Sequence, residues 1–192
     1  MTTMLTAVFA EPVLDAQRCF RAVLEAMARP GRIYRVPGLA EAPAPLGAAA
    51  AAVLLTLADA DTPVWLDAGA TAETWLRFHA GCPIAAAPGK AAFVLACGTP
   101  PALAGLAQGT EEEPHRSATL VVQVAALEEG AGWRLTGPGI EHVHRLLVAG
   151  LPDRFAAEWA AQRASFPCGV DVVLCAGDSL AALPRTTALE TG

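Results

Sequence analysis

Residues 118–127 read Ala-Thr-Leu-Val-Val-Gln-Val-Ala-Ala-Leu, and this stretch carries the clearest strand pattern of the chain. Its β-branched and apolar side chains suit a pleated, packed surface. Residues 128–132, Glu-Glu-Gly-Ala-Gly, read as a turn, and residues 133–136, Trp-Arg-Leu-Thr, form a second strand pattern. Two such runs joined by a short glycine-containing loop predict a β-hairpin. We therefore expect antiparallel pairing between 118–127 and 133–136.

On either side of this hairpin, helix and strand patterns alternate. A helix over 15–28 is predicted because Phe20, Leu24 and Met27 recur at helical spacing, and Pro30 then ends it. An acidic, exposed loop is expected over 110–114. The same patterns predict strands over 32–36, 63–66, 91–97 and 170–176, and helices over 46–58, from Thr71 as N-cap to Gly81, and over 101–107, 141–148 and 153–164.

This order of elements predicts an α/β fold. One antiparallel hairpin among alternating helices and strands indicates a mixed β-sheet flanked by helices. The 192 residues suit a single domain, which we expect to span 1–192 with an ordered core from about residue 9 to residue 187.

The composition is poor in charge. The chain is 54% hydrophobic and 17% charged, below the usual charged fraction of about 25%. Much of the excess is alanine, as in residues 47–52, Gly-Ala-Ala-Ala-Ala-Ala. Such a surface is either partly covered by a partner or simply alanine-rich. A net charge of −6 argues against nucleic acid, because phosphate neutralisation needs clustered Lys and Arg.

The five cysteines form no C-x-x-C pair. The chain opens without a signal-peptide pattern, and no run of 18 apolar residues is free of Pro, Gly or charge. We therefore expect a reduced, cytoplasmic protein with no membrane contact.

Two segments are candidates for contact with an anion. The turn Gly137-Pro138-Gly139-Ile140 precedes the expected helix 141–148, and free N–H groups at a helix N-terminus favour anions. The alternative is a plain turn into the helix. Arg185, followed by Thr186 and Thr187, offers a fork of donors and two hydroxyls for a phosphate or phosphonate oxygen. The alternative is a segment whose arginine pairs with a carboxylate and docks the tail.

Other chemistry-bearing residues form no self-sufficient constellation. His142 and His144 lie two residues apart, which on the expected helix points them in different directions. We therefore expect no metal site, and catalytic residues remain unassigned. Gly89-Lys90 lacks the remaining residues of a phosphate-binding loop. This pattern favours a subunit over a complete enzyme.

Short motifs along nearly the whole chain resemble one family, the H subunit (PhnH) of the bacterial carbon–phosphorus lyase system. Each motif is weak alone, but their order and spacing are specific. They are Phe9, Pro12-Val13, Gln17, Phe20-Arg21, residues 26–31, residues 54–57, Asp59, Thr62, Trp65, Arg77-Phe78-His79, Gly109, Pro114, residues 117–121, residues 137–140, Phe166-Pro167, residues 169–171 and residues 183–187. One departure is Ala92, where the family usually has aspartate, so any role of that carboxylate is in doubt here.

The resemblance implies a non-autonomous subunit for phosphonate catabolism. The family supports displacement of adenine from ATP by a phosphonate, giving α-D-ribose 1-methylphosphonate 5-triphosphate, and assembles with the G, I and J subunits. In isolation it tends to form homodimers. Its fold is similar to the large domain of pyridoxal-phosphate-dependent transferases, without the cofactor, and Lys90 is the only lysine that could hold one.

We therefore expect no cofactor, and Arg185, Thr186, Thr187, Gly137 and Gly139 as candidate contacts for a phosphonate or nucleotide triphosphate. The alternatives are a stand-alone nucleotide- or pyridoxal-phosphate-binding transferase, and a purely structural scaffold subunit.

Overall fold

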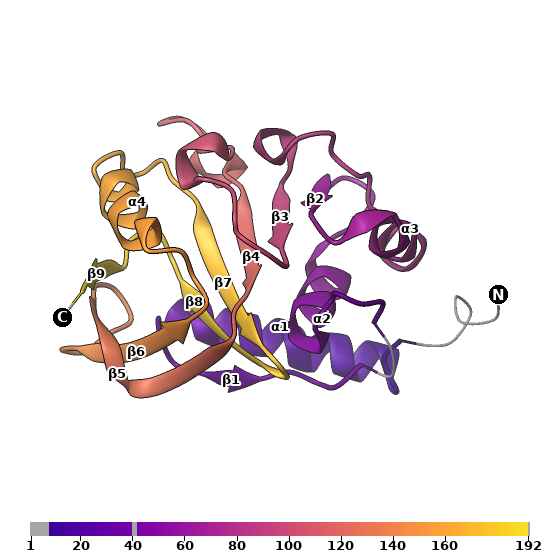
Figure 1. Ribbon diagram of the computed structural model, residues 1–192, viewed down its shortest axis with the longest axis horizontal. Coiled ribbons are helices and arrows are strands. Elements are labelled where there is room, and N and C mark those ends of the chain that lie inside the picture. The colour runs from indigo at the N-terminus through magenta and orange to yellow at the C-terminus, as the bar shows by residue number, and fades with distance from the viewer. Residues whose placement is uncertain (1–7, 40–41, 192) are drawn as a thin grey trace.

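A six-stranded mixed sheet forms the centre of the molecule (Figure 1). The computed structural model describes residues 8–39 and 42–191. In the order of the sheet the strands are β1 (Tyr34–Arg35), β8 (Ser179–Leu183), β7 (Asp171–Ala176), β4 (Thr119–Gln123), β3 (Phe93–Ala96) and β2 (Val64–Leu66). Strands β2, β3, β4 and β7 are parallel neighbours, whereas β8 runs antiparallel to both β7 and β1. The predicted mixed sheet is confirmed.

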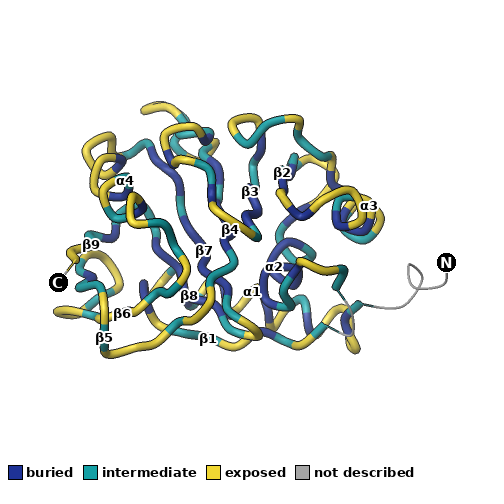
Figure 2. The backbone as a smooth tube through the Cα atoms, viewed as in Figure 1, coloured by how far each residue is buried: buried dark blue, intermediate teal, exposed yellow. Residues whose placement is uncertain are grey.

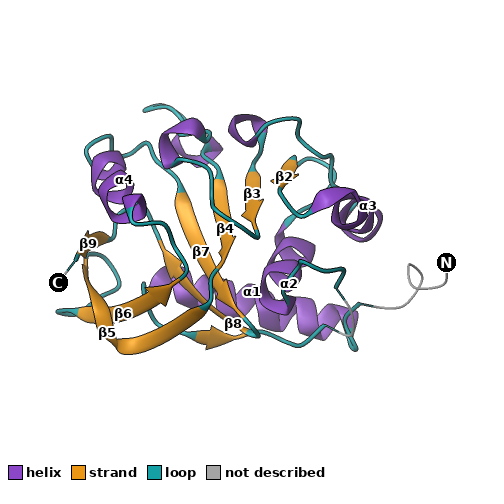
Figure 3. Ribbon diagram, in the orientation of Figure 1, coloured by secondary structure: helices purple, strands orange, loops and turns teal. Residues whose placement is uncertain are grey.

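Helices cover one face of this sheet. They are α1 (Pro12–Ala28), α2 (Ala48–Leu57) and α3 (Gly69–Ala80), and their buried side chains share one core with Val121, Val173 and Leu180. Helix α2 is buried over most of its length, as its uniformly apolar sequence predicts. Figure 3 shows these three helices on the opposite side of the sheet from the fourth.

The other face carries α4 (Arg154–Arg163) and a small antiparallel sheet in the order β6 (His144–Ala149), β5 (Ala126–Thr136) and β9 (Ala188–Glu190). A second core lies beneath them, where Leu120, Val122 and Leu174 meet Phe155 and Trp159. Ordered structure thus continues past Thr187 into β9.

Strand β4 takes part in no hairpin with residues 133–136, so this prediction was wrong. The consecutive residues Leu120, Val121 and Val122 of β4 are buried, and Figure 2 colours much of the central strands as buried. The neighbours β3 and β7 are parallel to β4. Such a central strand reads as a continuous apolar run rather than an alternating one. The strand ends at Gln123, and residues 126–136 form β5 in the other sheet.

The expected turn at 128–132 is a bulge within β5. Glu129 and Trp133 both stand opposite Leu146 of β6, so the residues between them are extra. Gly130 and Gly132 have φ angles of 90° and 73°, which only glycine adopts without strain. The two glycines therefore bend a strand instead of ending it.

The predicted helix over 141–148 was also wrong, because this segment contains strand β6. Leu146 is buried while Arg145 and Leu147 beside it are exposed, which is the alternation of a strand. A short apolar run such as Leu146-Leu147-Val148 fits the period of a helix as well as that of a strand. Here its pairing with β5 makes it a strand.

The remaining predictions were confirmed or needed small corrections. Most of these elements lie where expected: helices α1, α2 and α4, strands β1, β2, β3 and β7, and the loop before Pro114. Gly81 ends α3 with a φ of 70°, but Thr71 is not its N-cap, because α3 already begins at Gly69. The expected helix over 101–107 is a single 3-10 turn, Leu103–Gly105, and the alanine-rich strand β8 was missed.

Candidate functional site: the Arg185 network

Arg185 lies at the end of the sheet where the parallel strands begin. It follows β8, which runs antiparallel to β7, so it reaches the first residue of β7, Asp171. Ser117 lies just before β4 at the same edge. In open α/β sheets ligands usually bind beyond the carboxyl ends of the strands, at the opposite edge.

Arg185 and Asp171 form a two-pronged ion pair. Arg185 Nη2 donates to Asp171 Oδ2 at 2.6 Å, and Nε donates to Oδ1 at 3.2 Å. The main-chain N–H of Arg185 donates to the same Oδ1 at 2.8 Å. The two side chains are only 15% and 18% exposed. This pair therefore sits in a partly dry environment, where it is screened little by solvent.

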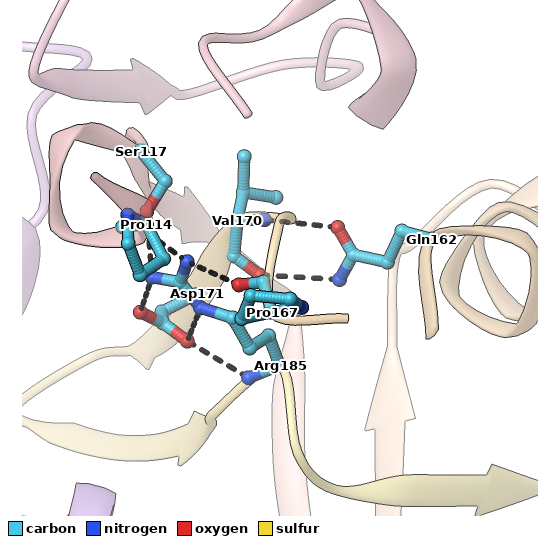
Figure 4. A network of polar contacts seen from close by, with 7 residues as sticks. All are labelled: Pro114, Ser117, Gln162, Pro167, Val170, Asp171 and Arg185. Carbon is cyan, nitrogen blue, oxygen red and sulfur yellow. Dashed lines mark hydrogen bonds and ion pairs between the residues drawn. The ribbon is translucent and has the colours of Figure 1, made fainter. Parts of the chain in front are cut away.

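The other donors of Arg185 are also taken. Nη2 donates to Ser117 Oγ at 2.6 Å, and Nη1 donates to the carbonyl oxygens of Pro114 at 2.9 Å and Pro167 at 3.3 Å (Figure 4). A guanidinium has five N–H donors, and these contacts use all of them. An anion could bind Arg185 only by displacing a protein acceptor. The geometry therefore favours the docking alternative for this residue.

Helix α4 holds the same region from the side. Its buried Gln162 donates from Nε2 to the Val170 carbonyl at 3.1 Å and accepts from the Val170 N–H at 3.0 Å (Figure 4). Trp159, one turn earlier, donates from Nε1 to the Thr187 carbonyl at 2.9 Å. The segment before β7 and the segment after β8 are thus both fastened to one helix.

Thr186 and Thr187 differ in their access to solvent. Thr187 is fully buried, and its hydroxyl has no hydrogen-bond partner among the described residues. Thr186 is partly exposed. A ligand outside the molecule can reach only the hydroxyl of Thr186.

The Gly137–Ile140 turn joins β5 to β6, so no helix N-terminus lies behind it and that part of the prediction was wrong. A Cβ at Gly137 would lie 3.0 Å from the Thr186 carbonyl oxygen. At Gly139, where φ is 82°, a Cβ would overlap the Ala28 carbonyl oxygen at the end of α1. Close packing against the chain accounts for both glycines. Anion binding by Gly137 and Gly139 stays a prediction.

The structure separates the two histidines. His144 is largely buried on β6, where its Nε2 lies 3.1 Å from the Gly31 carbonyl oxygen and 3.5 Å from Glu129 Oε2. His142 is exposed beside Glu141. Within residues 8–39 and 42–191, no three His, Cys, Asp or Glu side chains are grouped closely enough to hold a metal ion.

Lys90 does not fit a pyridoxal phosphate site. It is exposed in the 3-10 turn Pro88–Lys90, just before β3, and so lies at the edge where the parallel strands begin. In the described part of the chain no carboxylate pairs with it.

At the opposite edge, two polar side chains at the ends of β2 and β4 fasten the loop that follows β3 and the segment that precedes α2. Asp67 accepts the Cys97 N–H at 2.6 Å and the Gly98 N–H at 3.1 Å. Gln123 accepts the Gly47 N–H and donates to the Pro45 carbonyl at 3.0 Å. A cavity of about 120 Å³ lies beside Gln123, well below the roughly 300 Å³ of ordinary small-molecule sites. It is of a size for water rather than a nucleotide.

Burial keeps the thiols at this edge protonated. Burial, with Asp67 adding to it, raises the pKa of Cys97 to about 12. Burial likewise raises the pKa of Cys175, which lines the cavity. Since the thiolate is the nucleophile, neither cysteine is a reactive one at neutral pH.

Three residues of this network were not predicted from the sequence. Ser117 and Asp171 accept hydrogen bonds from Arg185, and Gln162 holds the segment before β7. Ser117 and Asp171 stand within motifs that carry the family resemblance, which was the available signal. Gln162 has no local signal, since it belongs to an ordinary helix pattern.

Comparison with known proteins identifies the family. Residues 7–190 match the family described as bacterial phosphonate metabolism protein (PhnH). The chain belongs to the PhnH family. It is 46% identical over 187 residues to the α-D-ribose 1-methylphosphonate 5-triphosphate synthase subunit PhnH of Rhizobium meliloti (strain 1021), covering 95% of this chain and 94% of that protein. It is 36% identical over 171 residues to HtxG of Stutzerimonas stutzeri, covering 89% of this chain and 84% of that protein.

Proposed function

We propose that this chain is a subunit of α-D-ribose 1-methylphosphonate 5-triphosphate synthase in C–P lyase phosphonate catabolism. The observation that carries the proposal is the 46% identity to the Rhizobium meliloti subunit over 95% of this chain. The family match over residues 7–190 spans the residues of both cores.

In the proposed reaction a phosphonate oxygen attacks the ribose anomeric carbon of ATP and adenine leaves. We propose that this chain supports the reaction without performing it alone. Arg185 is the best anion-binding side chain of the C-terminal motif. Its guanidinium N–H groups already donate to acceptors within the protein, and this supports the view.

The proposal includes its partners: the G, I and J subunits of the core complex, and a second copy of the chain in isolation. It also includes a fold similar to the large domain of pyridoxal-phosphate-dependent transferases, which the mixed six-stranded sheet supports. No helix within the described residues is long and apolar enough to cross a membrane. The five free cysteines support a reducing, cytoplasmic location.

The decisive experiment is an adenine-release assay with ATP and methylphosphonate. The purified chain alone should release none. Addition of the G and I subunits, together with the ATPase-like L subunit that the family resemblance associates with this step, should produce release that depends on the chain. Adenine release by the chain alone, or a bound pyridoxal chromophore reducible onto Lys90, would overturn the proposal in favour of a stand-alone enzyme. A cell that lacks this subunit should regain growth on phosphonate when the chain is supplied.

The scaffold alternative differs only in whether the chain contacts substrate. A structure of the assembled complex soaked with methylphosphonate or ATP would show whether Thr186, Gly137 or Gly139 lies against the ligand. Ligand density against none of the five candidate residues, Arg185 and Thr187 included, would leave a scaffold role.

The homodimer has a separate test. Sedimentation of the isolated chain at micromolar concentration should give a dimer. A strict monomer at that concentration would contradict this part of the proposal.

A further inference from the structure

Helix α1 carries an unusual share of the exposed apolar surface. Of the eight large apolar side chains that are exposed among the described residues, four belong to α1: Val13, Leu14, Phe20 and Leu24, at 71%, 47%, 50% and 55%. The inner side of the same helix packs Cys19, Val23 and Ala26 into the core beside the sheet. Figure 1 shows α1 lying along the margin of the molecule, where its outer side faces away from the sheet.

Three of these residues form a ridge with the half-buried Met27. The positions Val13, Gln17, Phe20, Leu24 and Met27 follow one another at spacings of four, three, four and three. This is the repeat of a helix-packing seam, whose side chains insert between those of a facing helix. Gln17 is exposed and stands in the seam as its one polar position, the kind of residue that sets the register of two paired helices. We call Val13, Gln17, Phe20, Leu24 and Met27 the α1 ridge.

The charges beside the ridge have one unpaired member. Arg18 pairs with Asp15 at 2.9 Å, and Arg29 pairs with Glu25, so these arginines are satisfied within α1. Arg21, next to Phe20, is exposed, and no carboxylate within the described ranges pairs with it. The flank of the ridge therefore presents a free guanidinium.

We infer that the α1 ridge docks an amphipathic helix of another subunit of the synthase, whose apolar seam is flanked by a carboxylate that pairs with Arg21. The inference rests on the proposed function, since it requires a partner subunit. The ridge spacing specifies a helix, and Arg21 specifies the acidic flank. A specific interface usually has apolar anchors at its centre and polar or charged pairs at its rim.

A second copy of this chain fits the ridge less well. In a two-fold pairing of antiparallel helices, each residue near the middle of the ridge faces its own counterpart. Phe20 is the middle residue of the span from Val13 to Met27, so Arg21 of each copy would lie close to the other Arg21. Like charges brought together in this way oppose association.

The test uses the full chain co-expressed with the G, I and J subunits. Phe20→Ser should weaken binding to the other subunits by about thirtyfold, the loss typical of a central aromatic anchor. Phe78→Ser on α3 is the matched control, because Phe78 is exposed to 54% against 50% for Phe20. It should assemble like wild type. Both variants should keep the melting temperature of the isolated chain, since neither side chain is in a core.

A second pair of variants tests the charge. Arg21→Glu should weaken assembly at low salt, and the difference from wild type should shrink as salt rises, whereas Arg21→Lys should retain most of the affinity. If Arg21→Glu leaves assembly unchanged, the partner does not carry the proposed carboxylate.

The possible outcomes distinguish a failure of the docking inference from a failure of the proposed function. If the wild-type chain fails to assemble and fails to support adenine release, the proposed function falls and the inference with it. If wild type assembles and Phe20→Ser assembles equally well, only the inference falls. Should Phe20→Ser abolish the homodimer but leave the complex intact, a second copy occupies the ridge and the inference is overturned.

Discussion

At the scale of single residues, Arg185 shows how a side chain suited to binding an anion can be committed to structure. Its guanidinium meets acceptors from two separate segments: Pro114 and Ser117 before β4, and Pro167 and Asp171 around the start of β7. Each contact is charge-assisted on at least one side, so the contacts are stronger than neutral hydrogen bonds. The residue ties the edge of the sheet together.

Replacement of Arg185 by alanine should therefore destabilise the fold. Removal of one partner of a buried ion pair leaves the other charge uncompensated, at a cost of about 3 kcal/mol in the free energy of unfolding. Urea unfolding of Arg185→Ala should show this loss. Arg185→Lys should lose less but remain below wild type, because an ammonium cannot reproduce the fork on Asp171. A variant as stable as wild type that fails to support growth on phosphonate would restore the anion-binding role.

The thiol of Cys97 gives a second residue-scale prediction. Its pKa of about 12 reflects burial first and the Asp67 carboxylate second. Asp67→Asn removes the negative charge, so the pKa of Cys97 should fall and alkylation at pH 8 should become faster. Mass spectrometry of the peptide that contains Cys97 would measure the rate. An unchanged rate would mean that burial alone keeps this thiol protonated.

At the scale of elements, the end of α1 and the β5–β6 turn are fitted against each other. Gly139 passes so close to the Ala28 carbonyl that no side chain fits between them, and Gly31 is similarly crowded by Leu135 and His144. Two motifs that lie more than a hundred residues apart in the chain are thus one contact in space. Their glycines are explained by packing.

Gly139→Ala should destabilise the protein by more than the strain of a positive φ. Gly130→Ala is the matched control, because its φ of 90° is close to the 82° of Gly139 but a Cβ there meets nothing within 4 Å. The control should cost about 1 kcal/mol, and Gly139→Ala about 2 kcal/mol more, since backbone must move. Thermal unfolding of both variants would compare them. Equal losses would show that the turn can shift away from α1.

At the scale of the whole molecule, two cores on opposite faces of one sheet account for the stability. Alanine is the commonest residue in the core under α1, α2 and α3, whereas leucine is the commonest in the core under α4, which also holds Phe155 and Trp159. His79 lies in the last turn of α3 and its ring contacts Trp75 and Phe78, with its Nε2 buried and unpartnered among the described residues.

Global stability should fall in mild acid because of His79. Burial lowers the pKa of His79 below 6.5 in the folded state, so the unfolded chain binds more protons as the pH drops. The stabilisation is complete above pH 6.5 and is lost as the pH falls through the folded pKa. His79→Gln should make the free energy of unfolding less steep between pH 7 and pH 5, by at most about 1.4 kcal/mol per pH unit. An unchanged slope for His79→Gln would contradict the prediction.

The family, the α/β class and most single elements could be predicted from the amino-acid sequence. Helix α1 follows from its helical periodicity, strands β4 and β7 from their apolar, β-branched runs, and the family from the order of short motifs, since all are local properties of the sequence. The destabilising outcome for Arg185 was already one of the two alternatives that the sequence offered.

Which segments meet in space could not be predicted from the sequence and follows from the packing of the folded chain. Strand β4 pairs with β3 and β7 rather than with the segment that follows it, and Gly130 and Gly132 bend β5 instead of ending it. Arg185 finds its acceptors 14 and 68 residues away, at Asp171 and Ser117. Hydrogen-bond partners so distant in the chain leave no local pattern. A segment such as 144–149, whose apolar residues fit both periods, becomes a strand only because β5 lies beside it.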